Sequence, residues 1–128
     1  MSSYIVLWLD HDQASIYDFK TQEPEITHMH NRHHMNHHNV GRQVHEKLEE
    51  QKKFFHEVQD KVLVAKGVLI LGPSTAKHEF VSYVKDHHGK GLADRILGVE
   101  TMDKASDNQI VALSRKYFHK LNLFEPQV

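Results

Sequence analysis

The chain has 128 residues, of which 39% are hydrophobic and 26% are charged, a composition typical of one packed domain rather than of a disordered chain. Sixteen Lys and Arg against 17 Asp and Glu leave a formal net charge of -1, which argues against a protein that coats nucleic acid or membranes by bulk charge. Cysteine is absent, which excludes disulfides, thiolate metal sites and cysteine nucleophiles, whereas 13 residues are histidine.

The N-terminal part of the chain predicts three strands joined by short turns. Residues 4–9 are almost all apolar, which is typical of a strand buried on both faces. Turn-forming residues over Asp10–Gln13 and a second apolar segment over 14–19 predict a hairpin. Another turn around Pro24 precedes a weaker strand over 25–29. Because short turns join antiparallel neighbours, we expect these three strands to form a meander.

A histidine-rich segment follows, and it has no useful apolar period. It predicts a loop over about residues 28–41, which Gly41 ends. No acidic residue lies between Ile26 and His45, but two basic residues, Arg32 and Arg42, lie there. The histidines of the loop are His28, His30, His33, His34, His37 and His38.

The rest of the chain alternates between helices and strands. Apolar residues at helical spacing predict the longest helix over 44–62, and the continuous apolar run 68–71 predicts a central parallel strand. Ser74 is a candidate N-cap for the next helix, and 95–100 predicts a fifth strand. The last helix begins at Ser106, which opens a Ser-Asp-Asn-Gln capping-box sequence.

The order of elements is therefore β-β-β-α-β-α-β-α within one domain, residues 1–128. The two later strands follow helices, so they need crossovers and run parallel to their neighbours. This predicts an α/β protein with a ribonuclease-H-like mixed sheet, and a different mixed α/β sandwich is the alternative. Without a membrane-spanning segment or signal peptide we expect a cytoplasmic protein with no membrane partner, either a monomer or a homodimer.

Ribonuclease-H-like nucleases gather carboxylates around two metal ions, so we asked whether this chain has the acids for that chemistry. Asp10 ends the first strand, where such an acid belongs, but Gly72 stands at the end of the strand over 68–71. We therefore interpret Asp10 and Asp12 as turn-forming residues. The remaining candidate acids are Glu46, Glu49, Glu50, Asp103 and Asp107.

The histidine-rich loop leaves three interpretations open. Neutral imidazoles bind zinc or nickel, so the six histidines are candidate metal ligands. Alternatively, histidine stacks on bases and contacts phosphate when it is protonated, while Arg32 and Arg42 add permanent positive charge. The third interpretation is a solvated loop without a ligand.

Several segments resemble a known family. Val68–Phe80, Ile96–Thr101, Asp107–Gln109 and Arg115–Phe118 resemble small bacterial "translational machinery proteins", which are grouped with relatives of archaeal and eukaryotic class-I peptide release factors. The early hairpin and the histidine-rich loop are also similar, so the resemblance covers nearly the whole chain. It implies the middle domain of release factors, which has a ribonuclease-H-like topology without nuclease activity. It also implies the ribosome or tRNA as partner.

In release factors the loop after the third strand carries a Gly-Gly-Gln motif whose glutamine positions the hydrolytic water. This chain has Gly41-Arg42-Gln43 there, and an arginine lacks the φ freedom of the second glycine. We therefore expect a non-enzymatic translation protein that needs no cofactor, with Arg32, Gly41, Arg42 and Gln43 contacting RNA. Lys77, expected on an exposed first helical turn, is a further candidate contact. Peptidyl-tRNA hydrolysis with Gln43 orienting water is one alternative, and metal binding through the histidines is the other.

Overall fold

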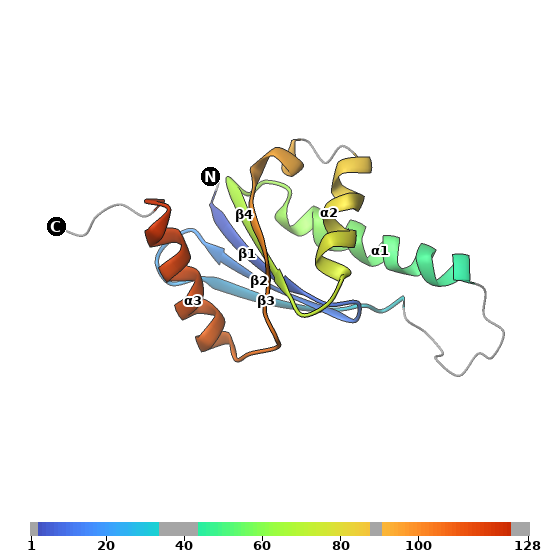
Figure 1. Cartoon of the computed structure of the whole chain (residues 1–128), viewed down its shortest axis with the longest axis horizontal. Helices are drawn as coiled ribbons and strands as arrows, with labels where there is room; N and C mark the ends of the chain where they lie inside the picture. Colours follow the sequence, from blue (N-terminus) through green and yellow to red (C-terminus); the bar gives the residue numbers. More distant parts are fainter. Residues whose placement is uncertain (1–2, 34–43, 88–90, 124–128) are drawn as a thin grey trace.

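The computed structural model describes residues 3–33, 44–87 and 91–123 (Figure 1). Its elements are, in chain order, β1 (Tyr4–Leu9), β2 (Gln13–Phe19), β3 (Glu25–His30), α1 (Val44–Val62), β4 (Gly67–Gly72), α2 (Ala76–Asp86), the short 3-10 helix η1 (Leu92–Arg95), β5 (Ile96–Thr101) and α3 (Asp107–Lys120). This order confirms the prediction. None of the described helices is long and apolar enough to cross a membrane.

The five strands form one mixed sheet in the order β3-β2-β1-β4-β5. The two pairs joined by short turns, β1 with β2 and β2 with β3, are antiparallel, whereas β4 runs parallel to both β1 and β5. Helical crossovers bring the chain back to the same end of the sheet before β4 and β5, which makes these strands parallel. The predicted α/β fold with a ribonuclease-H-like mixed sheet is confirmed.

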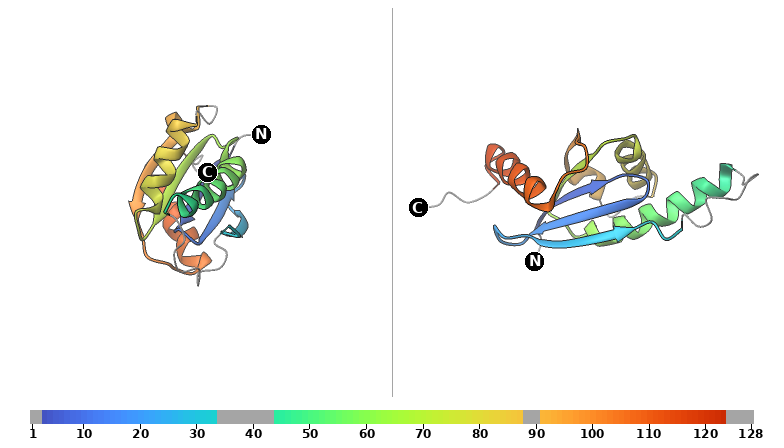
Figure 2. Two further views of the ribbon diagram at one scale, coloured as in Figure 1. Left: turned by 90° about the vertical axis from the view of Figure 1, so that its right-hand side faces the viewer. Right: turned by 90° about the horizontal axis from the view of Figure 1, so that it is seen from below.

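Helices cover both faces of the sheet (Figures 1 and 2). α1 and α2 pack on one face with buried side chains that include Phe54, Val58 and Phe80, and α3 packs on the other face with Ile110 and Phe118. Successive side chains of a strand point to opposite faces, so a central strand between two helical layers must be apolar throughout. The burial of all six residues of β4 follows from this position.

Side-chain hydrogen bonds, as well as packing, fix the start of α3 and the position of β1. α3 begins with the predicted capping box, in which the Ser106 hydroxyl accepts from the Gln109 amide and the Gln109 side chain accepts from the Ser106 amide. Trp8 of β1 is 2% exposed, and its Nε1 donates to the Met102 carbonyl at 3.1 Å. α2 differs slightly from expectation, since it begins at Ala76 with Thr75 as its N-cap residue rather than Ser74.

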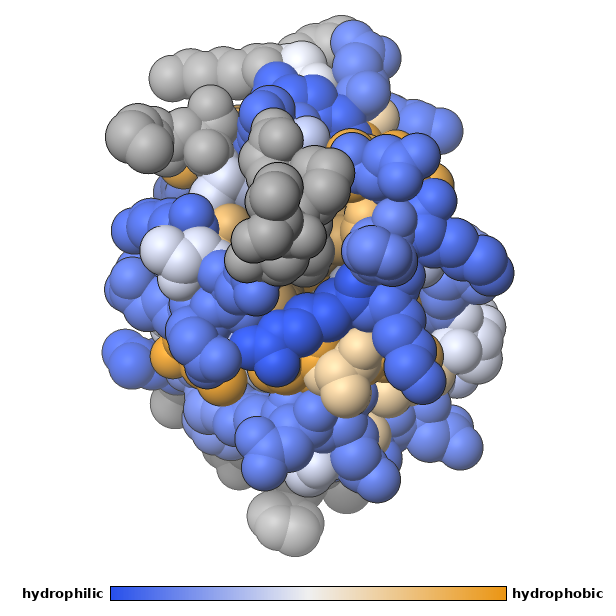
Figure 3. All heavy atoms as spheres, turned by 90° about the vertical axis from the view of Figure 1, so that its left-hand side faces the viewer, coloured by the Kyte–Doolittle hydropathy of each residue, from blue (hydrophilic) through white to orange (hydrophobic). Residues whose placement is uncertain are grey.

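The α3 side of the molecule exposes some apolar surface. Leu113 and Leu121 are 42% and 44% exposed, and Figure 3 shows hydrophobic patches between hydrophilic side chains on this side. A hollow of about 390 Å³ lies between α3 and the strands β4 and β5, with Lys116 and Lys120 among its lining residues.

Candidate functional site

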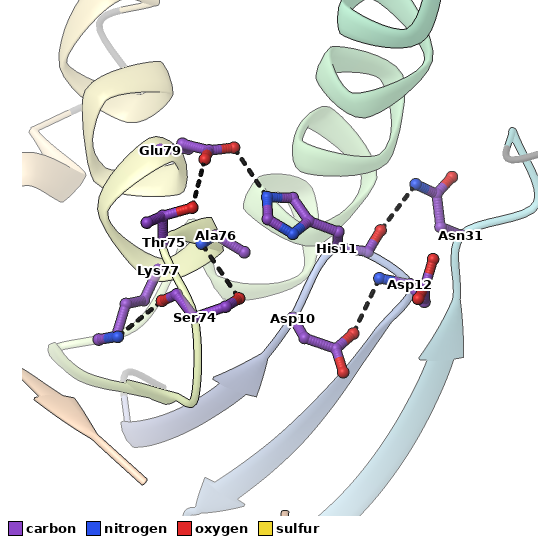
Figure 4. Close-up of polar contacts among 9 residues, drawn as sticks. All are labelled: Asp10, His11, Asp12, Asn31, Ser74, Thr75, Ala76, Lys77 and Glu79. Carbon is purple, nitrogen blue, oxygen red and sulfur yellow. Dashed lines mark hydrogen bonds and ion pairs between the residues drawn. The ribbon is translucent and has the colours of Figure 1, made fainter. Parts of the chain in front are cut away.

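The carboxyl ends of β1 and β4, the exit of β3 and the start of α2 meet at one edge of the sheet (Figure 4). The β1–β2 turn at this edge is closed by Asp10, whose Oδ1 accepts from the backbone amides of Asp12 at 2.8 Å and Gln13 at 2.9 Å. This confirms the interpretation of Asp10 as a turn-forming residue. The carboxylate that a nuclease would direct at metal ions is here directed at its own backbone.

A polar chain joins this turn to α2. His11 Nε2 lies 3.0 Å from Glu79 Oε1, and the Thr75 hydroxyl donates to Glu79 Oε2 at 2.7 Å (Figure 4). Burial alone would raise the pKa of Glu79, but the Thr75 hydroxyl and His11 outweigh it and lower the pKa below its ordinary value. Glu79 is therefore held as a carboxylate that stabilises the contact between the hairpin and the helix.

Lys77 does not lie where we expected it. The side chain is buried, with 4% exposure, and its Nζ donates to the Ser74 carbonyl at 2.6 Å (Figure 4). Because α2 begins only at Ala76, the ammonium folds back onto the β4–α2 turn and satisfies a carbonyl that no helix bond reaches. The expectation of an exposed RNA contact at Lys77 is wrong.

Asn31 holds the C-terminal end of β3 against the β1–β2 turn, and the sequence did not reveal this role. Its backbone amide donates to the Asp12 carbonyl at 2.8 Å, and its Nδ2 donates to the His11 carbonyl at 3.0 Å. Its Oδ1 accepts from the His33 amide at 3.0 Å. The side chain is 7% exposed. Asparagine commonly bonds nearby backbone at turns, but nothing in the order of residues identifies a partner 20 positions away.

The structure places four of the predicted site residues: His28, His30, Arg32 and His33. His28 and His30 lie on β3 rather than in a loop, because Ser15 and Gln13 of β2 pair with them through the backbone. Arg32 is exposed just beyond the strand. The remaining predicted site residues, which lie outside the described residues, are His34, His37, His38, Gly41, Arg42 and Gln43.

Two of the described histidines of the segment, His28 and His33, have carboxylate partners on helices. His28 Nε2 lies 3.1 Å from Asp107 Oδ2 of α3, and His33 Nε2 lies 3.2 Å from Glu57 Oε2 of α1. Among residues 3–33, 44–87 and 91–123, no three His, Asp or Glu side chains are arranged to hold a metal ion. Within this part of the chain, His28 and His33 pair with protein acids.

A second hollow, of about 400 Å³, lies beside His33 between α1 and α2. His87 at the end of α2 stacks on Tyr83 with ring centroids 4.0 Å apart and an interplanar angle of 22°. Burial raises the pKa of Tyr83, and the charge of Asp60 adds to the effect, so the phenol stays protonated. The lining residues are His33, Glu49, Lys52, Lys53, His56, Glu57, Tyr83 and His87. Ammonium groups next to exposed imidazole rings are the side chains that contact phosphates and stack on bases.

Solved structures to which this chain is similar include two Pelota proteins and an archaeal translation termination factor. Pelota of Archaeoglobus fulgidus superposes with a TM-score of 0.61 at 15% identity, over 89% of this chain and 31% of Pelota. Pelota of Thermoplasma acidophilum gives 0.61 at 12% identity, over 86% and 31% of the two chains. The archaeal translation termination factor aRF1 gives 0.52 at 18% identity, over 94% and 40%. The fold is shared with Pelota and aRF1.

The chain corresponds to one part of these larger proteins, since it spans less than half the length of each. At such identities the likeness establishes the fold, not the activity. No protein-family model and no curated protein matches the sequence.

Proposed function

We propose that the protein is a ribosome- or tRNA-associated translation protein that contacts RNA through its histidine- and arginine-rich segment and does not hydrolyse peptidyl-tRNA. The observation that carries the proposal is the fold shared with the translation termination factor aRF1 over 94% of the chain. The sequence resemblance to bacterial translational machinery proteins points the same way. We also propose that the protein works away from membranes.

The described base of the segment supports this role. Asn31 holds the exit of β3 against the β1–β2 turn, so the segment leaves the sheet from a fixed point. Arg32 is exposed at that point, and His33 faces the hollow that Lys52 and Lys53 also line. RNA that meets the segment would therefore meet permanent positive charge on α1 as well.

The test is co-sedimentation of the untagged protein with ribosomes at low and moderate salt. Because β3 runs to His30 and Asn31 is buried, the loop variant replaces only residues 34–40 by a Gly-Ser linker and leaves the sheet intact. A triple variant with Arg32→Gln, Lys52→Gln and Lys53→Gln removes the three positive charges beside the segment. The control, Lys116→Gln with Lys120→Gln, removes charge from the α3 side instead.

We expect wild type and the control to co-sediment in a salt-sensitive manner, and both site variants to lose affinity. Each phosphate contact removed lowers the log-log salt slope by about 1, so the triple variant should lower it by up to about 3. Protein that stays at the top of the gradient, or site variants that behave like the control, would overturn the proposal.

The absence of peptidyl-tRNA hydrolysis from the proposal has its own test. We expect no release of peptide from peptidyl-tRNA on ribosomes, with or without Gln43→Ala. Turnover that collapses in Gln43→Ala while ribosome binding persists would replace our proposal by hydrolysis. Stoichiometric zinc or nickel in untagged protein, lost on substitution of His33, His34, His37 and His38, would support the metal alternative.

A further inference from the structure

A third hollow, of about 250 Å³, lies under the start of α3 above the outer strands β2 and β3. Ser15 and His28 are directly paired across these two strands, and both side chains line the hollow on the face that α3 covers. Asp107, the first residue of α3, lines it from above. Residues far apart in the sequence thus bring a hydroxyl, an imidazole and a carboxylate to one opening.

These three side chains form a continuous hydrogen-bonded chain. Ser15 Oγ lies 2.8 Å from His28 Nδ1, and His28 Nε2 lies 3.1 Å from Asp107 Oδ2. A carboxylate only accepts hydrogen bonds, so Nε2 of neutral His28 carries the proton. The lone pair of Nδ1 then faces the Ser15 hydroxyl, which is the arrangement in which an imidazole takes a proton from a serine.

Tyr17 fixes the carboxylate at the far end of the chain. Its hydroxyl donates to Asp107 Oδ1 at 2.7 Å. Burial raises the pKa of Tyr17 strongly, and the neighbouring Asp107 raises it further, so the phenol remains a donor at physiological pH. With one oxygen held by Tyr17, the other oxygen of Asp107 is oriented toward His28.

We propose that Ser15 is a nucleophile for small acyl esters, with His28 as its general base and Asp107 as the positioning residue. A hydroxyl bonded to a base that is itself oriented by a third group is the arrangement that makes serine reactive in hydrolases of unrelated folds. The inference does not depend on ribosome binding, because neither the cations of α1 nor residues 34–43 take part.

When a serine attacks an ester, the carbonyl oxygen becomes a negatively charged oxyanion, and the same hollow contains a positive charge that can stabilise it. Lys104 lines the hollow, and its Nζ donates to Gln13 Oε1 at 3.3 Å. Gln13 lies two residues before Ser15 on β2, so its side chain points to the same face of the sheet. The backbone amides of this strand pair take part in the sheet, so we assign the stabilisation of the oxyanion to the ammonium of Lys104, which lines the hollow.

The reaction balances without a cofactor. Ser15 Oγ bonds to the ester carbonyl carbon while its proton moves to His28 Nδ1. The carbon-oxygen bond to the alcohol then breaks, and the alcohol leaves with that proton. Water attacks the acyl-serine in the same way, releasing the carboxylic acid and restoring Ser15. A hollow of about 250 Å³ has room for a short acyl chain.

The experiment uses an alkyl fluorophosphonate, which bonds its phosphorus to an activated serine and releases fluoride. Intact-mass and peptide-mapping spectrometry locate and time the adduct in wild type and in the variants Ser15→Ala, His28→Asn and Asp107→Asn. Ser82→Ala, an exposed serine on α2, is the matched control. Circular dichroism and urea unfolding verify that each variant is folded.

We expect one adduct, at Ser15, which persists in Ser82→Ala and disappears in Ser15→Ala. The labelling rate should fall at least about a hundredfold in His28→Asn and in Asp107→Asn, the lower end of the effect of general-base catalysis. Wild type should also hydrolyse p-nitrophenyl acetate faster than Ser15→Ala does. An unlabelled Ser15, labelling that folded His28→Asn leaves unchanged, or equal ester hydrolysis by wild type and Ser15→Ala would overturn the proposal.

Discussion

Replacing Asn31 by alanine should destabilise the protein and release the exit of β3. The variant loses two partly buried hydrogen bonds, from Nδ2 to the His11 carbonyl and from the His33 amide to Oδ1, each 3.0 Å long. The backbone bond to Asp12 remains, because any residue but proline can donate it. At about 0.5–1.5 kcal/mol for each bond, the free energy of unfolding should fall by about 1–3 kcal/mol.

Urea unfolding followed by circular dichroism measures this loss. With a urea dependence of about 1–3 kcal/mol per molar for a small domain, the midpoint should fall by about 1 M. Asn108→Ala is the matched control, since Asn108 is exposed on α3 and should change stability by no more than about 0.5 kcal/mol. Equal midpoints for the two variants would refute the idea that Asn31 fastens this exit. In the sedimentation assay, Asn31→Ala should also weaken ribosome binding. Part of the binding free energy would then be spent on fixing the chain just after β3, which Asn31 fixes in the wild type.

Three further predictions test other parts of the structure. Ser106→Ala should cost about 1 kcal/mol by removing the α3 cap, whereas exposed Ser82→Ala should cost little, and equal losses in thermal unfolding would count against the cap. Gly72→Ala should cost about 3 kcal/mol, because its methyl group would overlap a β1 carbonyl. Gly98→Ala should cost less, because the overlapping atom is a movable tyrosine hydroxyl, and the reverse order in urea would be inconsistent with this account. Glu79 has a folded-state pKa below its ordinary 4.5, so its stabilisation is present above that value and is lost as pH falls through the lower one. The stability difference between wild type and Glu79→Gln should therefore be full above about pH 4.5 and shrink as the pH falls below it, and a constant difference would contradict the shift.

The order and pairing of the elements followed from local signals in the sequence. Two wholly apolar segments became the central strands β1 and β4, because both faces of the sheet are covered by helices. The Ser106 capping box marked the start of α3 correctly. The histidine-rich composition concealed the end of β3, since strand pairing uses the backbone and accepts His28 and His30 as readily as any other residues.

The contacts of the candidate sites could not be predicted, because they join residues that only the fold brings together. The partners of His28 are Ser15, reached through the register of β2 with β3, and Asp107, reached through the position of α3 over the sheet. Lys77 was expected at the surface, and its burial follows from where α2 begins. A composition rich in histidine and acidic residues indicates that some imidazoles will pair with carboxylates, but it does not identify the pairs.

The sheet also explains why nuclease chemistry does not belong at the carboxyl edge of β1 and β4. Two-metal hydrolysis needs carboxylates from neighbouring strand ends, all directed at the same ions. Asp10 directs Oδ1 at two amides of its own turn, and Gly72 leaves no room for a side chain against the Leu9 carbonyl. An acid at position 72 would separate β1 from β4 before it could bind a metal ion. The close approach of the two central strands therefore excludes a second carboxylate at position 72. Room for chemistry lies instead in the hollow under α3, where Ser15 and His28 face Asp107.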